Sequence, residues 1–98
     1  MLYAAVHDHR AWPLGLEELE YLKKKLKHLN YNYRLDLEVR MFALSDHPEY
    51  RYTLVKFEHV SGNTPKRIVL LETHDKEQMA SALKMLVSIE ETEMKQRS

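Results

Sequence analysis

A strict alternation of apolar and charged residues at positions 34–41 constrains the fold more than any other feature of the sequence. The apolar members are Leu35, Leu37, Val39 and Met41, and the charged members are Arg34, Asp36, Glu38 and Arg40. Successive side chains of a β-strand point to opposite faces, so a period of two predicts a strand with one buried and one solvated face. We therefore expect a strand over residues 34–44 whose apolar face is covered by another element.

A turn-forming segment, residues 45–48, separates this strand from a second predicted strand over residues 50–60. Centring the hairpin loop on His47 predicts a register in which apolar residues meet on the inner face and charged or aromatic residues meet on the outer face. The predicted inner pairs are Leu37 with Phe57 and Val39 with Val55, and the predicted outer pairs are Glu38 with Lys56 and Phe42 with Tyr52.

Two segments have the spacing of three and four residues that is typical of amphipathic helices. In the first, leucines recur from Leu16 to Leu29 and acidic residues precede basic ones, which complements the helix dipole; we expect this helix to end at Asn30. The second is predicted to begin at a cap formed by Asp75 and Gln78, and the chain is expected to fray from about Thr92. Its predicted buried stripe comprises Met79, Leu83, Leu86 and either Ile89 or Glu90.

The remaining strands are predicted over residues 2–9 and 66–73. The second of these contains consecutive apolar residues, Ile68 to Leu71, so we expect something to cover both of its faces. The predicted fold is α+β: an antiparallel sheet of three to four strands with two amphipathic helices, in the order β-α-β-β-β-α. A chain of 98 residues is expected to form a single compact domain over residues 1–98.

Composition excludes several classes of function. With 15 basic and 15 acidic residues the formal net charge is zero, so no global field attracts nucleic acid or an anionic membrane. The absence of cysteine excludes disulfides and thiolate metal sites, and fits a cytoplasmic protein. No signal peptide or membrane-spanning segment is predicted.

Two histidine-containing motifs are candidates for chemistry. His7 and His9 would share one face of a strand, as two ligands of a metal-dependent enzyme could, but no third ligand stands in a compact motif with them. His74 and Asp75 lie at a strand-to-helix junction, where Asp75 already serves as a predicted cap and no nucleophile accompanies His74. We therefore predict no catalytic residues, no cofactor and no enzymatic activity.

Nucleic-acid binding is an alternative function. Four tyrosines near the central hairpin, close to several cations, could stack the bases of a single strand: Tyr31, Tyr33, Tyr50 and Tyr52. The helix, three-strand, helix portion also resembles double-stranded RNA-binding domains in element order. It departs from them because the glycine-proline-histidine turn and the lysine pair that opens that family's final helix are missing. Interleaved acidic residues further weaken this alternative.

The preferred prediction is a small non-catalytic protein that binds and modulates or inhibits a protein partner, of the inhibitor, immunity-type or phage-encoded host-modulating class. In the predicted register an apolar cluster forms on the outer sheet face, and such surfaces are seldom left bare. The partner-binding residues predicted there are Tyr50, Tyr52, Phe42, Arg40 and Lys56. A homodimer through this face is the related alternative. Alanine at Tyr52 and Phe42 is expected to weaken partner capture while the fold stays intact.

Overall fold

The computed structural model describes residues 2–6, 15–41, 48–62 and 64–97. Its elements confirm the predicted α+β class and the order β-α-β-β-β-α. In chain order they are β1 (Leu2–Val6), α1 (Glu17–Leu29), β2 (Tyr33–Met41), β3 (Glu49–Glu58), β4 (Lys66–Thr73) and α2 (Lys76–Arg97). The strands form one antiparallel sheet in the spatial order β1-β2-β3-β4.

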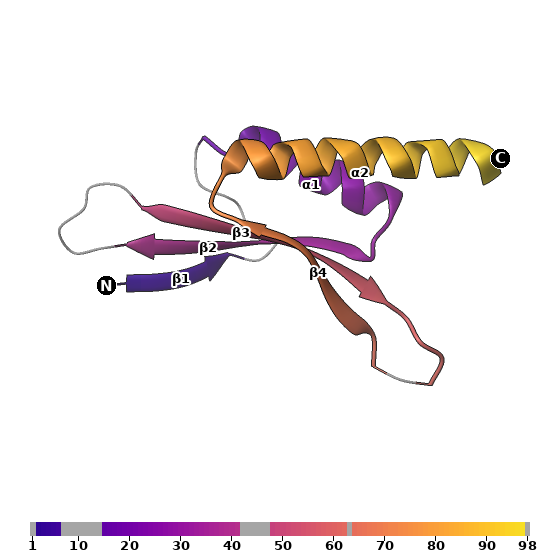
Figure 1. Ribbon diagram of the computed structural model, residues 1–98, viewed down its shortest axis with the longest axis horizontal. Coiled ribbons are helices and arrows are strands. Elements are labelled where there is room, and N and C mark those ends of the chain that lie inside the picture. The colour runs from indigo at the N-terminus through magenta and orange to yellow at the C-terminus, as the bar shows by residue number, and fades with distance from the viewer. Residues whose placement is uncertain (1, 7–14, 42–47, 63, 98) are drawn as a thin grey trace.

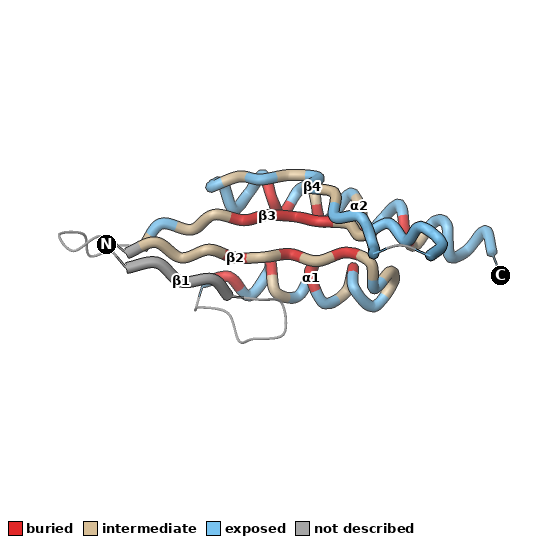
Figure 2. The backbone as a smooth tube through the Cα atoms, turned by 90° about the horizontal axis from the view of Figure 1, so that it is seen from below, coloured by how far each residue is buried: buried red, intermediate tan, exposed pale blue. Residues whose placement is uncertain are grey.

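Both helices lie on the same face of the sheet (Figure 1). The first, α1, packs against β2, whereas α2 packs against β3 and β4, and the two helices also contact each other. The buried residues concentrate in β2, in β3 and on the sides of the helices turned toward them (Figure 2). We call the helix-covered side the inner face and the opposite side the outer face. Because neither helix crosses over, the outer face has no helix on it.

Local contacts explain where α1 begins and ends. Gly15 has a φ of 92°, a backbone conformation that favours glycine, and its N–H donates to the Glu17 carboxylate at 3.1 Å. At the other end the Asn30 N–H donates to the Leu26 carbonyl at 2.8 Å, which confirms the predicted end of the helix at Asn30. Inside the helix Glu20 pairs with Lys24 at 3.1 Å, one turn later.

The start of α2 confirms the predicted cap. The Asp75 carboxylate accepts the N–H of Glu77 at 2.9 Å and that of Gln78 at 3.4 Å, which satisfies donors that have no partner within the helix. The Gln78 side chain accepts the hydroxyl of Thr73 at 2.7 Å, so it ties the first turn to the end of β4.

The far end and the buried stripe of α2 differ in detail from the prediction. The helix continues to Arg97, past Thr92, because no glycine or proline interrupts it and a pair one turn apart, Glu93 with Arg97 at 3.5 Å, stabilises its last turn. Of the two alternatives for the stripe, Glu90 is buried and Ile89 is 45% exposed.

The register of β2 and β3 corrects the prediction. Leu37 lies opposite Tyr52 instead of Phe57, a shift of five positions, and Leu35 lies opposite Leu54. An odd shift turns every β3 side chain to the other face, so the predicted placement of Tyr52 on the outer face is wrong. The physical reason is volume: this register buries the larger apolar set of β3, Tyr50, Tyr52 and Leu54, beneath the helices.

The core follows from this register. On the inner face Tyr52 is 2% exposed and packs with the leucines of β2 and with buried residues of both helices, such as Leu19 and Leu83. On the outer face Val55 is also buried, between its cross-strand neighbours Arg34 and Val69. Neighbouring side chains of the outer face therefore bury Val55 themselves, and no further element is needed to cover it.

Candidate interaction surface at the sheet edge

The outer face is lined by ion pairs instead of the predicted apolar cluster. Arg51 of β3 pairs with Glu38 of β2, and its other guanidinium nitrogen lies 3.3 Å from Glu72 of β4. Arg34 pairs with Asp36 at 3.0 Å, and its guanidinium lies 5.2 Å from the centre of the Phe57 ring. Cations that already contact acids offer little net charge to a phosphate backbone or an acidic partner.

Four of the five residues predicted to bind a partner are described by the structure, and these four do not form one surface. Tyr52 is buried and Tyr50 is half-buried on the inner face, whereas Arg40 lies on the outer face opposite Glu49. The ammonium of Lys56 lies 5.2 Å from the ring of Tyr33, on the inner side. Phe42 lies outside the described residues. Their contribution to partner binding stays a prediction, but it can no longer rest on a shared face.

The four tyrosines of the nucleic-acid hypothesis, all within the described residues, differ in exposure. Tyr33 and Tyr52 are buried at 6% and 2% exposure, and Tyr50 is half-buried, whereas Tyr31 is 74% exposed. A platform for stacking bases needs accessible ring faces. These rings therefore do not form a continuous stacking surface.

The histidine motifs acquire no catalytic partners in the described residues. The His74 Nδ1 lies 2.9 Å from the Tyr50 carbonyl oxygen, and Asp75 caps α2, so both already have structural contacts. His7 and His9 lie outside the described residues, as does His47. Across residues 2–6, 15–41, 48–62 and 64–97 no cluster of three potential metal-ligating side chains is found. Of the described helices, none combines the length and apolarity needed to cross a membrane.

The outer edge of β4 has no hydrogen-bonding strand beside it among the described residues. Leu54 and Val55 of β3 pair with Leu71 and Val69, so Leu70 is an additional residue in a β-bulge. Val69 and Leu70 are 46% and 44% exposed. An edge strand with apolar side chains is a template for another strand. The α2 helix contacts the inner face of β4, but the cover expected over its second face is absent from the described residues.

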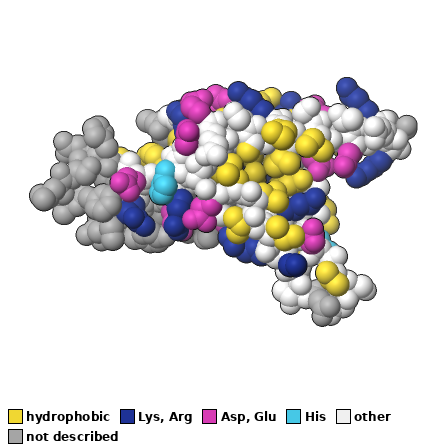
Figure 3. All heavy atoms as spheres, in the orientation of Figure 1, with side chains coloured by type: hydrophobic (Ala, Val, Ile, Leu, Met, Phe, Trp, Pro, Cys, Tyr) yellow, Lys and Arg dark blue, Asp and Glu magenta, His cyan; other side chains and the backbone are white. Residues whose placement is uncertain are grey.

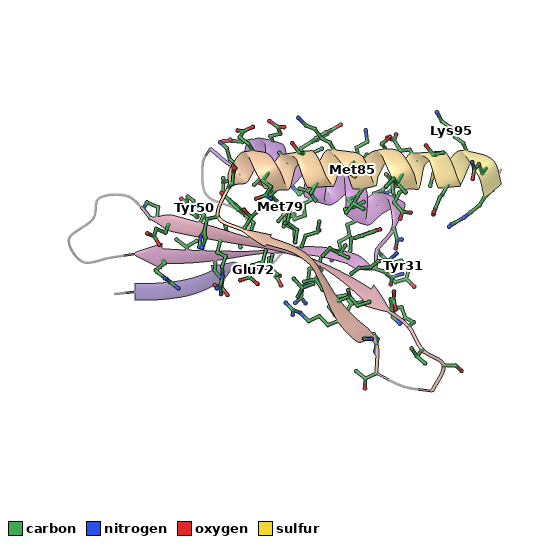
Figure 4. All side chains as sticks on the ribbon, viewed as in Figure 1. Tyr31, Tyr50, Glu72, Met79, Met85 and Lys95 are labelled. Carbon is green, nitrogen blue, oxygen red and sulfur yellow. The ribbon has the colours of Figure 1, made fainter. Side chains whose placement is uncertain are left out.

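One flank of α2 adjoins this edge. Lys84 pairs with Glu18 of α1 at 2.9 Å, so that side of α2 faces α1. At 3.6 residues per turn, Leu86 and Ile89 lie roughly opposite Lys84, on the side of α2 away from α1. Met85 is 63% exposed on the same flank, whereas Met79 points toward the sheet (Figure 4).

Together these residues form a single apolar surface. A space-filling view shows hydrophobic side chains continuing from α2 down onto β4 (Figure 3). We call this the edge surface and define it by Ile68, Leu70, Leu71, Met85, Leu86 and Ile89. Leu71 and Leu86 are half-buried and pack against the core, so the surface is held by rigid elements. The sequence signal for it was the width of the apolar face of α2, which exceeds one buried stripe.

A buried polar cluster holds the middle of α2 to the α1–β2 connection. Glu90, 8% exposed, accepts the Tyr33 hydroxyl at 3.2 Å and the Asn30 side-chain amide at 3.4 Å. Burial, together with the negative charge of Glu90, raises the pKa of Tyr33 to about 12. The cluster fixes the side of α2 that turns inward, and therefore the flank that turns outward.

This pKa predicts a dependence of stability on alkaline pH. The folded state retains the Tyr33 proton above pH 10, where the unfolded chain loses it. The contribution of Tyr33 to the free energy of unfolding should therefore be fully present below about pH 10 and be lost between about pH 10 and 12. An ultraviolet titration of phenolate absorbance should lose a late step in Tyr33→Phe but keep it in Tyr31→Phe. If the late step kept its full amplitude in Tyr33→Phe, that result would contradict the buried cluster.

Comparison with protein-family models, with curated proteins and with solved structures found no match to this chain.

Proposed function

We propose that this chain is a non-catalytic protein-interaction domain that binds a protein partner through the edge surface. In this proposal an extended segment of the partner pairs with the outer edge of β4 while its side chains pack against α2. The observation that carries the proposal is the juxtaposition of an unpaired edge strand in the described sheet with an exposed apolar helix flank.

The energetics of the edge surface support this function. Covering a few hundred Å² of apolar surface contributes several kcal/mol at about 25 cal/mol per Å², before the costs of association. Main-chain hydrogen bonds to β4 would give affinity and direction, and contacts with Leu70 and Ile89 would select apolar side chains in the partner. Such binding requires no titrating group, nucleophile or metal.

Two other predicted functions receive less support. Nucleic-acid binding lacks an accessible tyrosine platform, and the outer-face arginines Arg34 and Arg51 contact acidic side chains. The metal-dependent enzyme depends on His7 and His9, which lie outside the described residues. The proposal includes an inhibitor, immunity-type or host-modulating role in the cytoplasm. Identification of the captured partner tests that role.

The proposal predicts which substitutions abolish binding. Tagged chain carrying Leu70→Lys or Ile89→Lys should lose proteins that the unaltered chain captures from its host, because a lysine in the interface must be desolvated. Both positions are partly exposed, so circular dichroism should show an unchanged fold.

The matched control is Arg40→Ala, which alters the outer face and leaves the edge surface intact. Mass spectrometry of the captured proteins should give the same set for Arg40→Ala and the unaltered chain. Loss of capture in Arg40→Ala together with full capture by both lysine variants would overturn the edge surface and favour the outer face.

A further inference from the structure

We infer that the strand which pairs with β4 is β4 of a second copy of this chain, so that two copies form a symmetric dimer with one continuous sheet. This inference rests on the proposed role of the edge surface and names its occupant. It is carried by the self-complementary charge and side-chain pattern of β4.

The charges of β4 match those of an antiparallel second copy. The strand has basic residues, Lys66 and Arg67, at its start and the acidic residue Glu72 near its end. When the strand is paired with itself about a two-fold axis between Val69 and Leu70, Arg67 of each copy faces Glu72 of the other, whose carboxylate it would share with Arg51 of that chain. Opposite charges directly across an antiparallel pair are stabilising, and symmetry makes the contact occur twice.

The bulge makes this register compatible with the pleat of the sheet. Arg67 and Glu72 pair with Phe57 and Thr53 of β3, two residues an even number of positions apart, so both lie on the outer face. In a regular strand without a bulge, Arg67 and Glu72 would point to opposite faces, because they are five positions apart. The register that matches the charges therefore also matches the faces.

The inner face pairs equally well. In the same register Ile68 of one copy faces Leu71 of the other, and both pair with inner-face residues of β3, Lys56 and Leu54. Matching inner faces place the helices of both copies on the same side of the joined sheet. The outward flanks of the two α2 helices would then face each other across the two-fold axis.

The exposed methionine of α2 lies close to this axis. The axis passes about 12 Å from the end of β4, at about 3.3 Å per strand residue, and α2 advances that distance in about eight residues. This position is next to Met85, and the flank there consists of uncharged Met85, Leu86 and Ile89. Because these three residues are uncharged, they do not repel their counterparts across the axis. Flexible methionine side chains also adapt well to such contacts.

The contact would be smaller than a standard stable interface, as expected for a dimer that dissociates on dilution. Each copy would contribute the eight residues of β4 and the flank of α2 around Met85, Leu86 and Ile89, which is fewer than the roughly 20 residues a side of a standard interface. A strand docked along the edge without a helix would leave Met85 and Ile89 bare. A second copy covers strand edge and helix flank together.

Analytical ultracentrifugation of the purified chain over a wide range of concentrations tests the inference. The unaltered chain should sediment as a dimer that dissociates on dilution. Arg67→Glu places two like-charge pairs across the axis and should raise the dimer dissociation constant by about tenfold or more. Glu72→Arg should raise the dissociation constant by a similar factor, because arginine would then face arginine at both cross-strand contacts.

Mixing the two variants gives the decisive result. In a dimer of one Arg67→Glu chain and one Glu72→Arg chain both cross-strand contacts again join opposite charges, so the mixture should associate more tightly than either variant alone. A weakened fold in one variant would not produce this recovery. No recovery on mixing, or an unaltered chain that is monomeric at every concentration, would overturn the inference.

The outcomes also separate this inference from the proposed function. A monomeric chain that captures another protein, and loses it in Leu70→Lys, would overturn the second copy and leave the proposed function standing. A chain that dimerises as predicted but shows no effect of Leu70→Lys or Ile89→Lys on the dimer would overturn the inference, because the edge surface would then lie outside the contact.

Discussion

Replacing Tyr52 with alanine is expected to lower the free energy of unfolding by about 3–5 kcal/mol, as for other large aromatic residues removed from a core. Tyr52 is 2% exposed and lies opposite Leu37, between the sheet and the helices. Alanine would leave a cavity that the surrounding core residues cannot fill completely. Chemical denaturation of the unaltered chain and the variant, at one chain concentration, measures the difference.

The control for Tyr52 is Phe57, which the structure places half-buried on the outer face. Phe57→Ala removes the contact with Arg34 and partial burial, so we expect a loss of about 1 kcal/mol. The register predicted from sequence gives the opposite order, with Phe57 in the core and Tyr52 on the surface. A larger loss for Phe57→Ala than for Tyr52→Ala would contradict the observed register.

Leu83→Ala is expected to have the second large effect, a loss of about 2–5 kcal/mol. Leu83 is fully buried where α2 packs on the core, so its removal deprives both the helix and the sheet of contacts. Domains of this size have only about 5–15 kcal/mol of net stability, and the thermal midpoint should therefore fall by more than about 10 °C.

Ser81→Ala is the matched control for Leu83→Ala, since Ser81 is exposed on the same helix and alanine favours helix formation. Its thermal midpoint should stay close to that of the unaltered chain or rise slightly. Equal losses in the two variants would mean that α2 is not packed through the side that contains Leu83.

Periodicity and end signals predicted the elements of this fold well. The alternation at residues 34–41 predicted β2, and the apolar run at residues 68–71 within the segment 66–73 predicted β4 with its observed bounds. Asn30 and Asp75 marked helix ends because their local hydrogen bonds depend on few neighbours. Information of this kind is contained in a few adjacent residues, so sequence alone supplies it.

The register of β2 and β3 could not be read in the same way. Both faces of β3 contain large apolar residues, Tyr52 and Leu54 on one and Val55 and Phe57 on the other. Hydrophobic alternation therefore fits either face, and the outcome depends on which set packs better beneath two helices. That comparison is a tertiary property and needs the positions of the helices.

The candidate site was predicted only in part. The apolar residues at positions 68–71 predicted cover on both faces of β4, but among the described residues only α2 lies over one of them, so a further neighbour stays a prediction. The sequence did not indicate the open edge of β4. Its location was missed, because strand order decides whether a strand is central or at an edge. The choice between Ile89 and Glu90 was equally open in the sequence, and the hydrogen bonds of Glu90 with Tyr33 and Asn30 settle it by turning Ile89 outward.

Amide hydrogen exchange along β4, measured by nuclear magnetic resonance at several chain concentrations, tests the accessible strand edge most directly. Amides that donate to β3 should be protected throughout. Those that point away from β3 should exchange rapidly in dilute solution and become protected as the concentration rises and β4 gains a neighbour. Two results would contradict an edge that is open in the single chain and closed by its partner. In one, the outward amides are protected even at high dilution; in the other, they exchange rapidly at every concentration.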